Sequence, residues 1–488
     1  MDYSQFLAMR QEIALLVVFL LVFLYDTFMP RRTLGGISWF ATACFALFTA
    51  YCFIWPVTGD VEAFAGMYVT SPVCDMIKSI LNVGVLVVLI QSTTWSAQDA
   101  QATRRGEFYE LLLVTLFGMY LMISGRHFLI FLIGLETASL PLAAMVAFDK
   151  QRYESHEAAI KYMLTAVFSS AVFMMGLSFV YALAGSMYFT EIATAVVSGH
   201  SALLVCALAF VIAGIGFKLS LVPFHLWTAD VYQGAPTPVT SYLSVISKGA
   251  AAFAFLVVMV QCFGAVYAEI WEWMLYALII ATITVGNLFA IRQKNMKRFL
   301  AFSSISQAGY IMLGVEAGAP AGMAALMFYV LVYIFSNLAA FCVIGAIENK
   351  TGKVSMTDYN GLSKTNPWLA FTMMLAMFSL AGIPPFAGFF SKFFIFTSAL
   401  SQGSIAIYIL VLIALINTII SLYYYLLVVK AMYISPEEPQ IGTMRSACGE
   451  RVAMWLCVAG IVGLGIVSWF YNEIITVSST TDLYTMLP

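Results

Sequence analysis

The segment "LLVCALAFVIAGIGFKLSLVPFHLW", residues 203–227, begins as almost pure hydrocarbon and then admits a lysine, a proline and a histidine. A bilayer-crossing helix needs about 20 apolar residues. A charge such as that of Lys218 near the bilayer centre costs at least about 2.5–3.5 kcal/mol. Pro223 removes a backbone donor, and His225 adds a second ionisable group. We therefore expect residues 202–225 to be an interrupted membrane span that carries its charge for a functional reason.

The composition of the whole chain agrees with a membrane location. Of 488 residues, 62% are hydrophobic and 10% are charged, whereas soluble domains have roughly 45–50% apolar and about 25% charged residues. The net charge of −2 excludes a strongly basic nucleic-acid-binding surface. The eight cysteines are scattered and form no CxxC or His/Cys cluster. No metal site and no cofactor site is predicted in this chain.

Apolar runs of spanning length recur along the sequence, and connections between them are short. Fourteen such spans are predicted, at residues 11–29, 36–55, 73–95, 108–124, 127–147, 158–184, 202–225, 238–264, 272–292, 298–316, 319–347, 367–400, 404–432 and 451–473. The sequence thus predicts an all-α polytopic membrane protein of about 14 transmembrane helices, with residues 1–488 as one transmembrane domain.

The basic residues give this arrangement a direction, because Lys and Arg accumulate on the cytoplasmic side of membrane proteins. Seventeen fall at or beside the loops after odd-numbered spans, namely Arg31, Arg32, Arg104, Arg105, Lys150, Arg152, Lys161, Arg292, Lys294, Lys297, Arg298, Lys350, Lys353, Lys364, Lys430, Arg445 and Arg451. Three fall on the other side: Arg10, Lys78 and Arg126. Both termini are therefore expected on the periplasmic side.

Three lysines belong to no loop, Lys218, Lys248 and Lys392, and one acid, Glu136, lies near the middle of the fifth predicted span. A static ion pair would use only two of them and leave net positive charge in hydrocarbon. A lysine can instead alternate between its charged and neutral forms as a carboxylate approaches and leaves. A row of such groups, joined by water and polar side chains, is predicted to be a proton relay.

Two interrupted spans indicate an internal repeat. "LVPFHLW" in the seventh span and "GIPPFAGF" in the twelfth each place a Pro-Phe step near a lysine. They lie five spans apart, and an odd offset reverses direction in the membrane, as in the inverted repeats of transporters. We predict a first repeat of spans 4–8, residues 108–264, and a second of spans 9–13, residues 272–432. Residues 1–95 and 451–488 would flank them.

Three long motifs carry a family resemblance. "GFKLSLVPFHLWTADVYQGAPTPVTSYLSVISKGA", "GNLFAIRQKNMKRFLAFSSISQAGYIMLG" and "MFSLAGIPPFAGFFSKFFIF" resemble the antiporter-like subunits of proton-translocating NADH:quinone oxidoreductase, respiratory complex I. The resemblance covers roughly residues 107–432. The phrase "TADVYQGAPTPV" points to the N type, the counterpart of mitochondrial subunit 2, rather than to the M or L types.

The resemblance implies a role for each candidate residue. Glu136 and Lys218 would form a coupled pair, Lys248 the central relay and Lys392 the terminal group that hands the proton outward. His225 would lie on the entry or connecting path, and the alternative that it caps the broken helix stays open.

The resemblance also implies an assembly. NADH, FMN, iron–sulfur clusters and quinone would belong to the whole complex and not to this chain, which has no Rossmann fingerprint, flavin motif or cluster ligands. The chain would be a translocase subunit in the bacterial inner membrane, beside other membrane subunits of complex I and lipid, without nucleic acid. Two alternatives remain: a subunit of a multisubunit cation/proton antiporter or membrane-bound hydrogenase, and a self-contained solute carrier.

Overall fold

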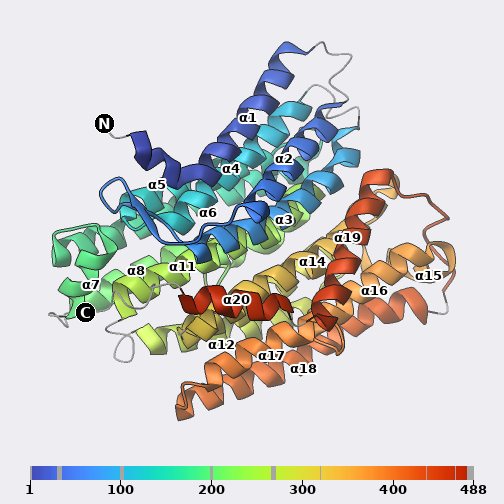
Figure 1. Cartoon of the computed structure of the whole chain (residues 1–488). Coiled ribbons are helices and arrows are strands. Elements are labelled where there is room, and N and C mark those ends of the chain that lie inside the picture. Colours follow the sequence, from blue (N-terminus) through green and yellow to red (C-terminus); the bar gives the residue numbers. More distant parts are fainter. Residues whose placement is uncertain are drawn as a thin grey trace.

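The computed structural model describes residues 3–29, 36–98, 104–197, 202–264, 271–318, 320–435, 437–467 and 469–480. These residues are mostly helical (Figure 1). Arg31 and Arg32, which the sequence predicts on the cytoplasmic side, lie outside the described residues.

The first half of the chain contains one short hairpin and a series of helices. Its elements are η1 (Tyr3–Met9), α1 (Arg10–Phe28), α2 (Ile37–Ile54), β1 (Val61–Ala63), β2 (Tyr68–Thr70), α3 (Pro72–Ser96), α4 (Arg105–Ser124), α5 (Phe128–Val146), α6 (Tyr153–Ala184), α7 (Phe189–Val197), α8 (Ala202–Leu219), α9 (Leu226–Gly234), α10 (Thr237–Tyr242), the π-helical turn η4 (Leu243–Ser247) and α11 (Lys248–Phe263). The antiparallel hairpin β1–β2 and helix α7 were not predicted from the sequence.

The second half has only helical elements among its described residues. Its elements are α12 (Trp271–Ile291), α13 (Met296–Ala317), α14 (Pro320–Thr351), η6 (Met356–Tyr359), α15 (Leu362–Thr365), α16 (Pro367–Ala381), α17 (Ala387–Leu400), α18 (Ile405–Tyr433), α19 (Cys448–Ile466) and α20 (Trp469–Thr480). The predicted last span, 451–473, is wrong at its end, because α19 stops at Ile466 and α20 begins anew.

Twelve helices in the described part of the chain are long and apolar enough to cross a membrane. This confirms an all-α polytopic membrane protein, two short of the predicted fourteen spans. Helix α13 has the length but carries a polar row, Ser303, Ser304, Ser306 and Gln307. Helices α16 and α17 are apolar but individually short.

Both predicted interruptions are present. Helix α8 ends at Leu219, and α9 begins at Leu226. The break therefore lies inside the predicted span 202–225, and the chain is helical again after that span. The Trp227 indole donates to the Phe217 carbonyl at 3.1 Å and thereby ties α9 back to α8. The second break separates α16 from α17, and Gly382 adopts the positive φ of 86° that ends α16.

Helix α14 lies at the centre of the molecule. It is 32 residues long, is buried over nearly its whole length and packs against α3, α13, α16, α17, α19 and α20. In Figure 1 the blue-to-green helices gather on one side, the yellow-to-orange helices on the other, and red α19 and α20 run across the front. The core is therefore one body built from both halves of the chain.

Helix α5, which carries the acidic candidate, approaches α4 very closely. A Cβ added at Gly118 would lie 2.4 Å from the Ala138 nitrogen, and one added at Gly134 would lie 2.7 Å from the Gly118 oxygen. Small residues allow such contact between membrane helices. The glycines therefore fix the position of the α5 turn that contains Glu136 and Ser139.

Several helix ends that lie near basic residues are hydrogen-bonded to one another. Gln98 after α3 bonds Asn349 of α14, which bonds Glu450 of α19, and Arg152 before α6 bonds Glu348 at 2.8 Å. These ends thus meet on one side of the molecule, called here the basic end.

Candidate functional site

Lys218 lies in the last turn of α8 and is 4% exposed. Its Nζ donates to the Ser139 hydroxyl at 2.7 Å and to the Ala138 carbonyl at 3.3 Å, both on α5. The Ser139 hydroxyl donates in turn to the Leu135 carbonyl at 2.6 Å. Because a hydroxyl has one proton and two lone pairs, this bond leaves a lone pair facing the lysine.

Glu136 lies three residues before Ser139, so the two side chains share a face of α5. The carboxylate is half-buried, and its Oε1 has no hydrogen-bond partner among the described residues. No ion pair within 4.0 Å joins it to a cation in that part of the chain. The structure thus brings Lys218 within one helical turn of Glu136 but docks the ammonium on neutral oxygens.

Lys248 follows directly after the π-helical turn η4 and is 1% exposed. Single π turns inside α-helices are frequent at functional sites, and this one was not predicted. The Lys248 Nζ donates to the Ser304 hydroxyl at 2.6 Å and to the Ser304 carbonyl at 3.0 Å. The Tyr232 ring centroid lies 5.8 Å away. Lys248 therefore connects the first predicted repeat to α13 of the second.

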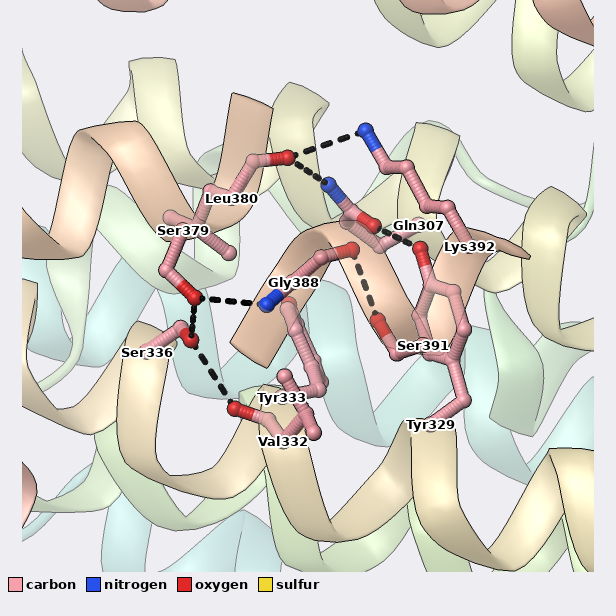
Figure 2. Close-up of a pocket in the computed structure, with 10 residues that line it drawn as sticks. All are labelled: Gln307, Tyr329, Val332, Tyr333, Ser336, Ser379, Leu380, Gly388, Ser391 and Lys392. Atoms are coloured by element: carbon pink, nitrogen blue, oxygen red, sulfur yellow. Dashed lines mark hydrogen bonds between the residues drawn. The ribbon is translucent and has the colours of Figure 1, made fainter. Parts of the chain in front are cut away.

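Lys392 lies on α17 and reaches back across the break to α16 (Figure 2). Its Nζ donates to the carbonyls of Leu380 at 3.0 Å and Ala381 at 3.1 Å. The last carbonyls of a helix lack intrahelical partners and carry partial negative charge, so they accept readily from a cation. The Tyr310 ring centroid lies 5.1 Å from the ammonium. The interruption of the twelfth predicted span therefore creates the acceptors that hold its lysine.

A small polar cavity of about 10 Å³ lies beside Lys392, which is roughly the space that one water needs. Figure 2 shows its polar lining: Gly388 N donates to the Ser379 hydroxyl at 3.1 Å, and Ser379 and Ser336 share a hydrogen bond at 2.7 Å. The Gln307 amide donates at 3.3 Å to the Leu380 carbonyl that also accepts from Lys392. Tyr329 donates to the Gln307 carbonyl oxygen.

Polar side chains on α13 lead from Lys248 toward Lys392. Ser303, adjacent to Ser304 in the sequence, hydrogen-bonds Tyr425 at 2.5 Å. Gln307, one turn further along α13, donates to the same Tyr425 hydroxyl at 3.1 Å. Because Gln307 also shares the Leu380 carbonyl with Lys392, the two lysine sites are joined by a nearly continuous row of polar groups.

His225 occupies the N-cap position of α9, inside the first break. Its side chain makes no capping hydrogen bond, and Nδ1 is buried without a partner among the described residues. His225 thus occupies the cap position of the broken helix without a side-chain capping bond, and its place on a connecting path stays a prediction.

The sequence interpretation missed further buried cations. Lys78 and Lys297, both assigned to loops, are each 1% exposed. Lys78 pairs with Glu12 at 2.6 Å, and Lys297 pairs with Glu348 at 3.1 Å. Both lysines lie near the ends of apolar runs, so their burial depends on tertiary packing. The acceptors Ser139 and Ser304 were also missed, although Ser139 lies one turn from Glu136.

Comparison with known proteins places the chain in a family. Residues 125–421 match the family described as "NADH:quinone oxidoreductase/Mrp antiporter, TM". The NADH-quinone oxidoreductase subunit N of Phocaeicola vulgatus is 52% identical over 97% of this chain and 98% of its own. The subunit N of Moorella thermoacetica is 39% identical over 90% of each chain.

Solved structures agree. A chain of respiratory complex I from Thermus thermophilus with bound aureothin is 31% identical and superposes with a TM-score of 0.79, covering 96% of this chain and 98% of that one. A chain of the Mrp complex from Dietzia has a TM-score of 0.82 and full coverage of both chains at 20% identity, which shows a shared fold alone. The resemblance noted in the three motifs is thereby confirmed: the chain belongs to the NADH-quinone oxidoreductase subunit N family, the antiporter-like membrane subunits of respiratory complex I.

Proposed function

We propose that this subunit carries protons across the bacterial inner membrane through Glu136, Lys218, Lys248 and Lys392, using energy from quinone reduction elsewhere in the complex. One observation carries the proposal. Among the described residues, all three lysines are buried and dock on neutral oxygens, with no carboxylate within 4.0 Å. A lysine held in this way can release its proton without leaving an unpaired carboxylate in the membrane interior.

The Glu136–Lys218 pair acts as the switch in this proposal. An approach of Lys218 to Glu136 stabilises the ammonium, and a return to Ser139 removes that stabilisation and favours release of the proton. The proton then moves to Lys248 and along the hydroxyls and amide of α13 to Lys392, which passes it outward. His225, inside the first break, contributes to the connecting path.

The proposal includes a finer architecture. Adding α13 and the broken pair α16–α17 to the twelve apolar helices gives fourteen spans, with residues 108–264 and 272–432 as inverted five-helix repeats. Their counterpart breaks, α8–α9 and α16–α17, each hold a lysine, which supports the repeat. The basic end faces the cytoplasm and both termini lie on the periplasmic side, as the positive-inside rule favours.

The partners and cofactors follow from the family. The chain contacts neighbouring membrane subunits of complex I, and NADH, FMN, iron–sulfur clusters and quinone bind to the whole assembly outside this chain. The fold is shared with the Mrp complex, but full-length relatives at 52% identity favour the complex I assignment.

The test is substitution of Lys218 in assembled complex reconstituted into vesicles. Lys218→Arg should abolish pumping, because arginine stays protonated. The double variant Glu136→Gln/Lys218→Met separates a switch from a static pair. If the pair is a switch, the double variant pumps no better than Lys218→Met alone. If the pair is static, the double variant recovers pumping, because neutralising both members of a buried pair is often tolerated. Full pumping by the arginine variant, or recovery in the double variant, would refute the relay.

A further inference from the structure

A pocket of about 520 Å³ with both polar and apolar lining lies at the basic end, between the start of α16 and the start of α19. It lies at the start of α16, whereas Lys392 docks on the carbonyls at the other end of that helix, and the proposed proton path does not use the pocket. Its polar and aromatic lining residues are Thr365, Asn366, Trp368, Arg445, Ser446, Arg451 and Trp455. No acidic residue lines it among the described residues.

The two arginines of the pocket are free to bind an anion. Neither Arg445 nor Arg451 forms an ion pair within 4.0 Å in the described part of the chain. The nearby acids are occupied elsewhere, since Glu437 accepts from Asn360, and Glu450 is buried and accepts from Asn349 and the Ala447 amide. The pocket thus presents two arginines that form no ion pair with a described carboxylate.

The backbone around the pocket is held in place. The Asn366 amide donates to the Gly442 carbonyl at 2.9 Å, and its oxygen accepts from Met444 N at 2.9 Å. Lys350 donates to the Arg445 carbonyl. These bonds fix the loop that carries Arg445 against the N-terminus of α16, whose dipole adds positive potential.

Apolar surface continues from the arginines toward the membrane interior. Arg451 and Trp455 are four residues apart and share a face of α19. Trp455 is 59% exposed and stacks on Trp368 with ring centroids 4.2 Å apart. Phe371, one turn beyond Trp368, is 39% exposed. The order along the surface is therefore arginine, tryptophan, then phenylalanine, the gradient from headgroup level to acyl level.

We infer that this pocket binds an anionic glycerophospholipid, with its phosphate on Arg445 and Arg451 and its acyl chains along Trp455 and Phe371. Basic pockets between helix ends on the cytoplasmic side suit such headgroups. The exposed aromatic track selects a lipid over free phosphate, because inorganic phosphate has nothing to place there. The lipid would contact both α16 and α19 and so stabilise their packing at the edge of the second predicted repeat.

The experiment uses the assembled complex, purified in mild detergent and stripped of loosely bound lipid. Added phosphatidylglycerol is titrated, and the lipid bound per complex is counted by mass spectrometry. Each Lys or Arg near a membrane surface contributes about fivefold in affinity for anionic lipid. The variant Arg445→Gln/Arg451→Gln should therefore bind one lipid fewer per complex, with roughly 25-fold weaker affinity at that site.

The control variant is Arg292→Gln/Lys294→Gln, which removes the same charge from an exposed loop at the basic end. It should bind lipid as the parent does. Trp455→Ala should also weaken the site while leaving both arginines in place. Phosphatidylcholine should not fill the site, and inorganic phosphate should not compete at millimolar concentration. Equal lipid occupancy in the arginine variant and the control, or full competition by inorganic phosphate, would overturn the assignment.

Discussion

Removing the Ser139 hydroxyl should disable the switch while both charged residues stay in place. Ser139→Ala deletes the 2.7 Å acceptor of Lys218 and leaves only the Ala138 carbonyl at 3.3 Å. Hydrogen bonds to charged groups contribute about 1.5–3 kcal/mol, and 1.4 kcal/mol is about tenfold in an equilibrium. The docked position of Lys218 should thus lose about 10- to 150-fold in population relative to the position near Glu136.

The assay is proton translocation by reconstituted complex, normalised to assembled enzyme and measured together with NADH:quinone reductase activity. We expect coupled turnover of Ser139→Ala to fall about tenfold or more. Ser139→Thr keeps the hydroxyl and should retain most of the activity. Ser169→Ala is the matched control, because the Ser169 hydroxyl also joins neighbouring helices, donating to the Gly214 carbonyl at 2.8 Å, but does not contact Lys218. Equal pumping by Ser139→Ala and Ser169→Ala would show that docking on Ser139 plays no part in transport.

Two further predictions concern the second break and the N-terminal helices. Gly388→Ala would place a Cβ 1.7 Å from the Ser379 carbonyl oxygen, and such overpacking costs about 1–3 kcal/mol or more. Proton pumping should fall because α17 and Lys392 shift. The control Gly463→Ala, whose added Cβ would have no atom within 4 Å, should pump normally. Breaking the buried Glu12–Lys78 pair with Lys78→Met should cost about 3–5 kcal/mol and lower the thermal stability of the complex in detergent. The double variant Glu12→Gln/Lys78→Met should recover most of that loss, and equal losses in the single and double variants would contradict a simple pair.

The sequence predicted those features that depend on local chemistry. Spans follow from runs of apolar residues, and both helix breaks follow from Pro223, Gly382 and the adjacent prolines. Side-chain partners depend on how helices pack, and no local pattern reports that. The sequence therefore placed Glu136 in the fifth predicted span and Lys218 in the seventh, but could not give the docking of Lys218 on Ser139. For the same reason it assigned Lys78 to a loop, although the residue is buried against Glu12.

The chain contains two kinds of buried lysine, and their difference argues for the proposed path. Lys78 and Lys297 are each 1% exposed and each contact a carboxylate. Loss of their proton would leave a buried carboxylate without its partner, so these pairs are suited to hold helices together. Lys218, Lys248 and Lys392 are buried to a similar degree but dock on hydroxyls and carbonyls. Those acceptors remain satisfied as neutral groups whether or not the lysine is charged. Burial alone therefore does not separate these two kinds of lysine. The neutral acceptor does, and it selects the three residues of the proposed path, which lie in or beside the breaks and the π-helical turn.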